Sequence, residues 1–184
     1  MEIRVEDLLK KNLKKEVIIF QTDTVYGIGC KIDNLEGVER IYEIKKRDGK
    51  KPLAVLCANL GQVKSIVSDF SLGQEFTKYW PGALTLIMPK NKLIGDFITS
   101  GYNTVGVRIP NDKIALSILE KFGPMAVTSL NLSTEPAILK YNDCLEYLEQ
   151  VDYLVKGIDL NSISSTVYDC INKRTLRNGE IKIN

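Results

Sequence analysis

The stretch Val17-Ile18-Ile19-Phe20-Gln21-Thr22-Asp23-Thr24-Val25-Tyr26-Gly27-Ile28-Gly29-Cys30 (residues 17–30) carries the pattern that decides the fold. Its first four residues form a short apolar run typical of a buried strand. Residues 24–30 contain β-branched and aromatic residues interrupted by two glycines, as in a strand whose backbone is approached closely by something else. We therefore expect two strands of a sheet near the start of the chain.

Predicted helices and strands alternate outward from this stretch along the whole chain. Apolar residues at helical spacing predict helices near residues 5–13, 34–44, 59–67, 71–80, 111–122 and 145–148. Short apolar runs predict further strands at residues 53–57, 84–88, 104–109, 125–127, 153–155, 166–168 and 181–183. Such interleaving favours one α/β domain, residues 1–184, with a mixed parallel and antiparallel sheet flanked by helices.

Composition and charge exclude several classes of protein. The chain has 184 residues, 44% hydrophobic and 26% charged, which suits one globular domain with a buried core. Its net charge of +2 gives no strong attraction to nucleic acid or an anionic membrane. No apolar run approaches the roughly 20 residues that span a bilayer, and the charged opening lacks a signal peptide's apolar stretch. We expect a cytoplasmic protein without a membrane partner.

The chain contains no histidine, which is the most informative absence. It excludes a Ser-His-Asp triad, a Cys-His dyad and every metal site that needs histidine. The four cysteines, Cys30, Cys57, Cys144 and Cys170, form no C-x-x-C pair, so we expect core residues rather than a zinc knuckle or a redox dithiol. Any chemistry must use carboxylates, lysine, arginine, hydroxyls, backbone amides or the substrate's own groups.

The familiar nucleotide-binding motifs are missing. Gly27-Ile28-Gly29 lacks the third glycine of G-x-G-x-x-G because Ile32 stands there, and no G-x-x-x-x-G-K-[ST] occurs. Polar or cationic residues instead follow the predicted strands, where open α/β sheets hold ligands. These segments are residues 22–27, 45–52, 104–110, 128–136 and 164–169, the last followed by residues 176–179.

Each segment also has a plain structural explanation when taken alone. Threonines favour half-buried strands, cations favour helix C-termini, and Ser, Thr and Asn favour capping turns. Arg108 either lies along an apolar surface with its charged end in water or meets a carboxylate. Five cations within residues 45–51 either face solvent or hold a polyphosphate.

Taken together and in this order, the segments resemble the YrdC/Sua5 family of threonylcarbamoyl-adenylate synthases. The family's T-[DE]-T-V-Y-G-[LI]-G corresponds to residues 22–29, and its K-x-R followed by a basic or amide residue before Pro-Leu corresponds to residues 45–53. W-P-G-x-[LV]-T is residues 80–85, V-x-V-R-x-P is residues 105–110, and the [TP]-S-A-N-x-S-G-x-P loop is residues 128–136. S-T-V and the later R-x-G are residues 165–167 and 177–179, so the match extends from about Val17 to Ile181.

The resemblance implies a YrdC-like fold with a concave cationic site and a defined reaction. L-threonine, bicarbonate or CO₂, and ATP would give threonylcarbamoyl-AMP and pyrophosphate, the first step of t6A formation at position 37 of tRNA. Mg²⁺ is expected as the partner of ATP, with no metal ligand from the protein. A threonylcarbamoyl transferase is the expected downstream partner, and direct tRNA contact is an open expectation.

The same resemblance assigns roles to ten residues. Lys45 and Arg47 are expected to stabilise charge during catalysis, with no general base assigned. The residues expected at ATP are Lys45, Arg47, Lys51, Thr104, Asn131 and Arg177. Those expected at threonine are Thr24, Arg108, Ser129 and Ser165, where the planar Arg108 guanidinium suits the amino-acid carboxylate. Tyr26 either lines the pocket or packs in the core.

Four departures from the family pattern keep two alternatives open. Asp48 replaces a usual proline, Leu130 an alanine and Thr134 a glycine, while Leu56 stands where some relatives have histidine. One alternative is a diverged nucleotide-binding relative with a different second substrate. The other is a module for double-stranded RNA or tRNA, whose binding would weaken steeply with salt and ignore threonine.

Overall fold

The computed structural model describes residues 1–46, 51–132 and 135–183. Within these residues ten strands form one sheet in the order β1-β8-β2-β3-β7-β4-β6-β5-β9-β10. The strands are β1 (Glu2–Ile3), β2 (Ile18–Phe20), β3 (Gly27–Lys31), β4 (Ala54–Leu56), β5 (Leu84–Pro89), β6 (Thr104–Arg108), β7 (Met125–Ser129), β8 (Tyr153–Val155), β9 (Thr166–Asp169) and β10 (Arg174–Arg177).

Helices fill most of the connections between these strands. They are α1 (Val5–Leu8), α2 (Leu35–Ile44), α3 (Leu60–Ile66), α4 (Asp96–Thr99), α5 (Lys113–Phe122) and α6 (Tyr141–Cys144), with 3₁₀ helices at Ser71–Tyr79 and Leu145–Tyr147. The side chains of Asn34, Asn59 and Asp112 accept backbone N–H bonds at the starts of α2, α3 and α5, as N-caps do. No helix of the described residues has both the length and the apolar character needed to cross a membrane.

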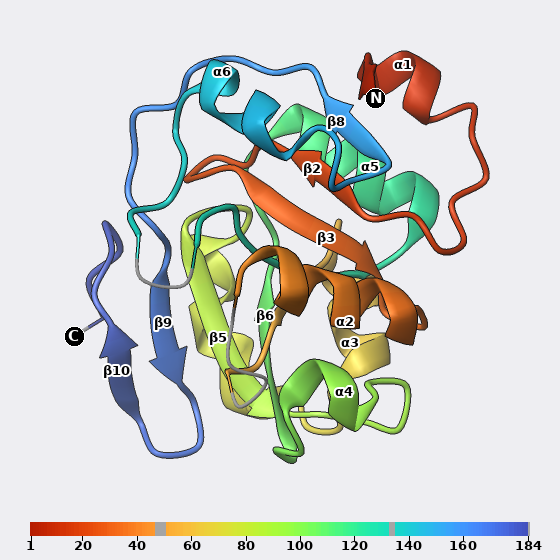
Figure 1. Cartoon of the computed structure of the whole chain (residues 1–184). Helices are drawn as coiled ribbons and strands as arrows, with labels where there is room; N and C mark the ends of the chain where they lie inside the picture. The colour runs from red at the N-terminus through yellow and green to blue at the C-terminus, as the bar shows by residue number, and fades with distance from the viewer. Residues whose placement is uncertain (47–50, 133–134, 184) are drawn as a thin grey trace.

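The sheet mixes both strand directions, which confirms the predicted α/β class. The pairs β4–β6, β5–β9, β1–β8 and β2–β8 are parallel, whereas β3 runs antiparallel to both β2 and β7. The β9–β10 hairpin lies at one end of the sheet, and α1 lies near the N-terminus at the other (Figure 1).

Two predicted strands were placed wrongly. Residues 24–26 belong to a loop, because the Thr22 hydroxyl bonds the backbone of Thr24 and Val25 and closes a turn there. The last strand is β10 rather than residues 181–183. Lys173 has a left-handed φ of 51°, which turns the chain back into a hairpin with β9. Every β10 residue is exposed, so no apolar pattern marked it.

The two faces of the sheet differ in how much is covered. Helices α2 and α3 pack on one face against alternate strand residues, including Ile28, Val55 and Val107. On the other face α1 and α5 cover only part of the sheet, where Leu56 and Val127 join a second core cluster. The rest of this second face, over β4, β5, β6 and β9, borders a cleft. Incomplete helical cover therefore creates the cleft.

The four cysteines occupy the core, as the sequence predicts. All are buried and none is in a disulfide bond. Burial raises the pKa of the Cys30 thiol to about 12, with a smaller contribution from the charge of Asp33. A thiol with so high a pKa stays protonated and unreactive at neutral pH.

Strands β3 and β7 approach each other too closely for side chains at Gly27 and Gly29. A Cβ at Gly29 would lie 2.8 Å from the carbonyl oxygen of Ala126, and one at Gly27 would lie 2.9 Å from a methyl of Val127. The predicted close approach is therefore confirmed. The neighbour is strand β7, through Ala126 and Val127. Gly27 still borders the cleft.

We predict that Gly29→Ala lowers the free energy of unfolding by about 1–3 kcal/mol, because the added methyl overpacks the contact between β3 and β7. Thermal unfolding followed by circular dichroism measures this as a fall in Tm. The matched control is Gly61→Ala in the exposed first turn of α3, where the change should stay within about 1 kcal/mol. Equal effects of the two substitutions would contradict the close approach.

Candidate active site

The cleft on the partly covered face has a volume of about 260 Å³. Arg108 and Arg177 are its charged lining residues within the described part of the chain. Hydroxyls from four segments surround them. The described lining consists of Thr22, Thr24, Val25, Gly27, Pro52, Leu53, Ala54, Leu56, Thr85, Ile87, Gly106, Arg108, Val127, Thr128, Ser129, Ser164, Ser165, Val167 and Arg177. The cleft thus combines cations and hydroxyls above an apolar floor.

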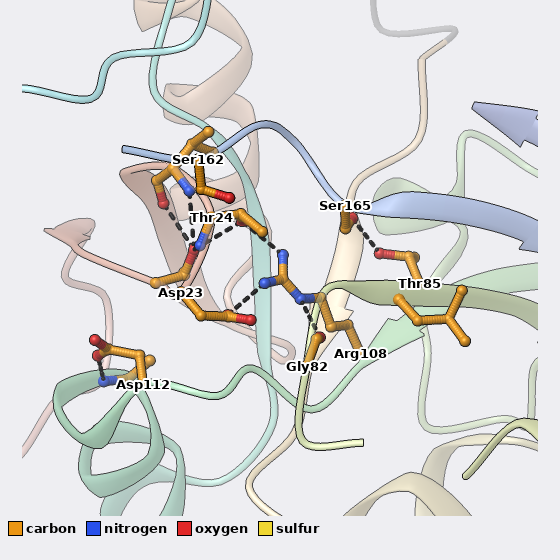
Figure 2. Close-up of polar contacts among 12 residues, drawn as sticks. Asp23, Thr24, Gly82, Thr85, Arg108, Asp112, Ser162 and Ser165 are labelled. Atoms are coloured by element: carbon orange, nitrogen blue, oxygen red, sulfur yellow. Dashed lines mark hydrogen bonds and ion pairs between the residues drawn. The ribbon is translucent and has the colours of Figure 1, made fainter. Parts of the chain in front are cut away.

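Arg108 ends β6 at the bottom of the cleft and is only 5% exposed. Its guanidinium donates from Nε to the Gly82 carbonyl at 3.0 Å, from Nη1 to Thr24 Oγ1 at 2.9 Å, and from Nη2 to Asp23 Oδ1. Figure 2 shows the guanidinium held among these three groups. Burial lowers the pKa of Arg108, and the Asp23 carboxylate opposes that shift. The cation is therefore buried, paired and fixed in direction.

Thr22 shapes the loop that brings Asp23 and Thr24 to Arg108. Its hydroxyl donates to the Val25 carbonyl at 2.8 Å and accepts the backbone N–H of Thr24 at 3.1 Å. Both Thr22 and Thr24 are buried, so these bonds replace water at the loop. Thr22 and Thr24, which lie between strands β2 and β3, thus form a preformed wall of the cleft.

Tyr26 is a core residue and does not line the cleft. Its hydroxyl donates to the Ile158 carbonyl at 2.7 Å, and its backbone bonds Leu130 and Ile138. Burial raises the pKa of Tyr26, which keeps the hydroxyl protonated as a donor. Tyr26 therefore joins Leu130 and Ile138 to the segment that leads toward Ser164 and Ser165.

Ser165 lies at the other side of the cleft with two polar neighbours. Its Oγ is 2.8 Å from Thr85 Oγ1 and accepts from Arg177 Nη2 at 3.1 Å, while Arg177 Nε donates to the Ser165 carbonyl at 2.9 Å. A Cβ at Gly179 would lie 2.5 Å from the Thr166 nitrogen. The glycine of Arg177-Asn178-Gly179 thus allows this segment to lie against residues 164–166 and places Arg177 over Ser165.

Lys45 is fully buried beside the cleft and holds the loop that follows β7. Its ammonium donates to the Ser129 carbonyl, to the Asn131 carbonyl at 2.7 Å and to Asn131 Oδ1 at 3.0 Å. Ser129 Oγ also donates to Asn131 Oδ1, at 2.7 Å. A buried cation needs such acceptors to offset the loss of water. Lys45 and the Ser129–Asn131 segment, which are distant in sequence, therefore meet in space.

The structure brings together some of the sequence-predicted residues and separates others. Thr24, Arg108, Ser129, Ser165 and Arg177 all line the cleft. Lys45 and Asn131 contact Ser129. Lys51 is exposed and precedes Pro52, which lines the cleft. Thr104 does not border the cleft; it lies at the start of β6, opposite Pro89. Arg47 lies outside the described residues.

The departures from the family pattern fall in different places. Leu56 lines the cleft and is 5% exposed, so it reaches the ligand side. Leu130 is completely buried in the core, away from the cleft lining. Its larger side chain therefore changes core packing rather than the cleft surface. Asp48 and Thr134 lie outside the described residues.

Polar residues of the site that were not among the predicted ones include Asp23 and Thr85. Asp23 stands between Thr22 and Thr24 in the sequence, but only the fold shows that it pairs with Arg108. Thr85 lies in an apolar strand, where a threonine is ordinary. Its pairing with Ser165 arises because β5 and β9 are parallel neighbours, and the sequence carries no direct signal of that.

A family model for Sua5, YciO and YrdC proteins, described as "Telomere recombination", matches residues 11–179. The chain belongs to the Sua5/YciO/YrdC family. The sequence resemblance is thereby confirmed.

Curated relatives in the family carry one name. The threonylcarbamoyl-AMP synthase of Pseudoalteromonas translucida is 33% identical, with 88% of this chain and 90% of the relative covered. The threonylcarbamoyl-AMP synthase of Bacillus subtilis is 34% identical over 89% of this chain but only 48% of the relative. The chain thus spans almost the whole of one relative and about half of the other.

Solved structures of family members share the fold. YciO from E. coli superposes with a TM-score of 0.87 at 26% identity, covering 97% of this chain and 90% of YciO. P. abyssi Sua5 in complex with L-threonine superposes with a TM-score of 0.84 at 28% identity, covering 92% of this chain and 53% of Sua5. These similarities confirm the predicted mixed-sheet α/β fold.

We predict that Lys45→Met loosens the loop after β7, because it leaves the carbonyls of Ser129 and Asn131 without their buried donor. The local cost should be about 1–3 kcal/mol. Hydrogen exchange followed by mass spectrometry should show faster exchange in a peptide covering residues 129–132. Lys64→Met is the matched control, because among the described residues the contact of the Lys64 ammonium is with the Phe70 ring and not with the loop after β7. Unchanged exchange in Lys45→Met would contradict the anchoring role.

Proposed function

We propose that this chain is a threonylcarbamoyl-AMP synthase, a nucleotidyltransferase. It would join L-threonine, bicarbonate and ATP into L-threonylcarbamoyladenylate, releasing pyrophosphate and water. The product is the activated precursor for t6A at position 37 of tRNA. The observation that carries the proposal is the buried Arg108 fixed at the base of a hydroxyl-lined cleft, in a family whose relatives bear this enzyme's name.

Arg108 supplies the site for the threonine carboxylate. A guanidinium has five N–H donors, and three of them already bind Gly82, Thr24 and Asp23. The remaining hydrogens on Nη1 and Nη2 are available for carboxylate oxygens. Thr24, Ser129 and Ser165 surround the rest of the amino acid as hydroxyl contacts. The P. abyssi Sua5 complex with L-threonine supports a threonine site in this fold.

ATP would occupy the side of the cleft near Lys45. The nucleotide contacts we propose are Lys45, Arg47, Lys51, Thr104, Asn131 and Arg177. Lys45 already holds the Ser129–Asn131 segment, so its charge lies next to backbone and hydroxyl groups at the cleft. Thr104 lies on the same face of β6 as Gly106 and Arg108, beyond the cleft, so only an extended ligand would reach it.

Mg²⁺ is proposed as the partner of the ATP phosphates. Among the described residues no cluster of three acidic or cysteine side chains is arranged to hold a metal. Mg²⁺ commonly binds through phosphate oxygens and water and needs few protein ligands. When bound, the ion would neutralise charge on the phosphates, while the protein's cations orient them.

The chemistry then consists mainly of positioning and charge stabilisation. The threonine amine attacks the carbon of bicarbonate, and water leaves to give the carbamate. A carbamate oxygen next forms a bond to the α-phosphorus of ATP, and the bond to the bridging oxygen breaks as pyrophosphate leaves. Positioned cations around such a displacement lower its barrier without proton transfer by the protein. The proposed charge-stabilising residues are Lys45 and Arg47.

Other parts of the biological setting are also proposals. The adenylate would pass to a threonylcarbamoyl transferase, and direct contact of this chain with tRNA is a separate hypothesis. A cytoplasmic location suits the four free cysteines, because reducing compartments keep thiols unpaired. The RNA-binding alternative is not favoured, since it leaves the buried Arg108 and the surrounding hydroxyls without a role.

The first test is pyrophosphate release from ATP and Mg²⁺, with threonine and bicarbonate each omitted in turn. Release should require both. We further predict that Arg108→Lys raises the KM for threonine about tenfold or more. A lysine ammonium has only three N–H donors and no planar arrangement of them, so it cannot bind the present partners of Arg108 and a carboxylate at once.

Arg40→Lys is the matched control, because Arg40 forms a half-exposed ion pair with Asp152 away from the cleft. It should leave both kinetic constants near those of the wild type. Release that ignores threonine would contradict the proposed function. A normal threonine KM in Arg108→Lys would contradict only the role of Arg108.

A further inference from the structure

Strand β10 leaves one edge of the sheet open. It is the last strand in the sheet order, and Figure 1 shows it at the edge of the molecule beside β9. All four of its residues are exposed, and among the described residues their backbone forms no hydrogen bond to any segment other than β9. Alternate residues of such a strand direct their N–H and C=O groups away from the neighbouring strand. The outer edge of β10 is therefore a row of unpaired backbone donors and acceptors.

The open edge carries positive charge. Residues 171–179 contain Lys173, Arg174 and Arg177 and no carboxylate. Lys173 and Arg174 form no ion pair within the described part of the chain. Asp169 lies opposite Arg174, but its carboxylate accepts three hydrogen bonds from the turn that joins β9 to β10. The cations of this hairpin can therefore pair with acidic groups of another molecule.

A bulge in β10 places both arginines on one face of the sheet. Arg174 lies opposite Asp169 and Arg177 lies opposite Val167, with a register shift between the two pairs. Asp169 and Val167 are two residues apart on β9, so they and their partners share a face, and Val167 lines the cleft. The face of β10 that carries Arg174 is therefore the cleft face. Leu176, within the register shift, is 50% exposed and adds an apolar side chain to the edge.

These features favour one kind of partner. A second copy of this chain would bring Lys173 and Arg174 against a strand of the same charge, and like charges on paired strands repel. The phosphates of a nucleic acid would match the charge but have no N–H donors for the outward carbonyls of β10. An extended peptide offers both donors and acceptors along its backbone, and acidic side chains on it match the cations.

We propose that β10 is a docking site for an acidic, extended segment of a partner protein, which adds to the sheet as a further strand. Its backbone pairs with the outer edge of β10, its acidic side chains meet Lys173 and Arg174, and its apolar side chains contact Leu176 and the exposed Ile171. A partner bound there lies at the rim of the cleft, because Arg177 of the same strand lines the cleft. This inference does not depend on the proposed reaction.

The test uses the whole chain, labelled with ¹⁵N, and the peptide acetyl-Glu-Val-Glu-Val-Glu-Val-amide as the probe. Titration followed by NMR should move the backbone amide signals of residues 171–177 and leave the rest of the spectrum in place. The same peptide with lysine at each glutamate should not bind, because its charge is reversed. The original peptide methylated at every backbone nitrogen keeps its charges but has no N–H donors, so it should bind about fivefold or more weakly.

Arg174→Glu tests the charge of the edge from the side of the protein. It should weaken binding of the acidic peptide about fivefold to tenfold, because an attraction is replaced by a repulsion at an exposed position. The matched control is Lys113→Glu at the exposed first residue of α5, which should leave the affinity unchanged. Amide signals that stay in place away from each substitution confirm that both variants are folded.

Several results would overturn the docking site. Absence of signal changes in residues 171–177 would show that β10 does not bind an acidic strand. Equal binding of the methylated peptide would show that charge alone acts and no strand is added. Signals of β10 that move with the concentration of the chain itself would assign the edge to a second copy. Signals that move with a short RNA duplex but not with the peptide would assign it to nucleic acid.

Discussion

The burial of the Arg108 guanidinium is the constraint on which the cleft depends. A cation that is 5% exposed must find oxygen partners, because the loss of its water shell costs several kcal/mol. Those partners come from the loop before β3 and from the turn before β5, so one side chain joins three segments distant in sequence. Asp23 offsets the charge, Thr24 and Gly82 complete the geometry, and the cleft is formed before any ligand arrives.

A second set of bonds keeps the surrounding loops in place around this cation. Tyr26 follows directly after the arginine-binding loop and bonds the chain at Leu130, Ile138 and Ile158. Lys45 holds the same 129–131 loop from α2. Both anchors are fully buried, so their bonds persist where water cannot compete. These bonds fix the hydroxyl-rich loops as walls of the cleft.

The sequence predicted most of the fold because apolar periodicity reports which residues are buried. The strand pattern at 17–20, 53–57 and 104–109 follows from core packing and is confirmed in β2, β4 and β6. It failed at β10, whose residues are all exposed, and at the turn closed by Thr22. The site was predicted through motif order, but two partnerships were not. Asp23 reaches Arg108 from a loop, and Thr85 meets Ser165 because β5 and β9 are neighbours, and no local pattern encodes either contact.

The lining of the cleft explains how a chain without histidine can support acyl and phosphoryl chemistry. Its described residues contain no carboxylate, lysine or cysteine, only two guanidiniums, hydroxyls and apolar groups. Such a surface binds anionic groups through fixed donors and has no side chain suited to take up a proton near neutral pH. In the proposed reaction, the threonine amine and bicarbonate would therefore exchange protons with each other or with water rather than with these side chains. For the proposed reaction, the protein would hold its anionic substrates close together. The donors are already oriented by the fold and would need no reorganisation as charge moves between the substrates.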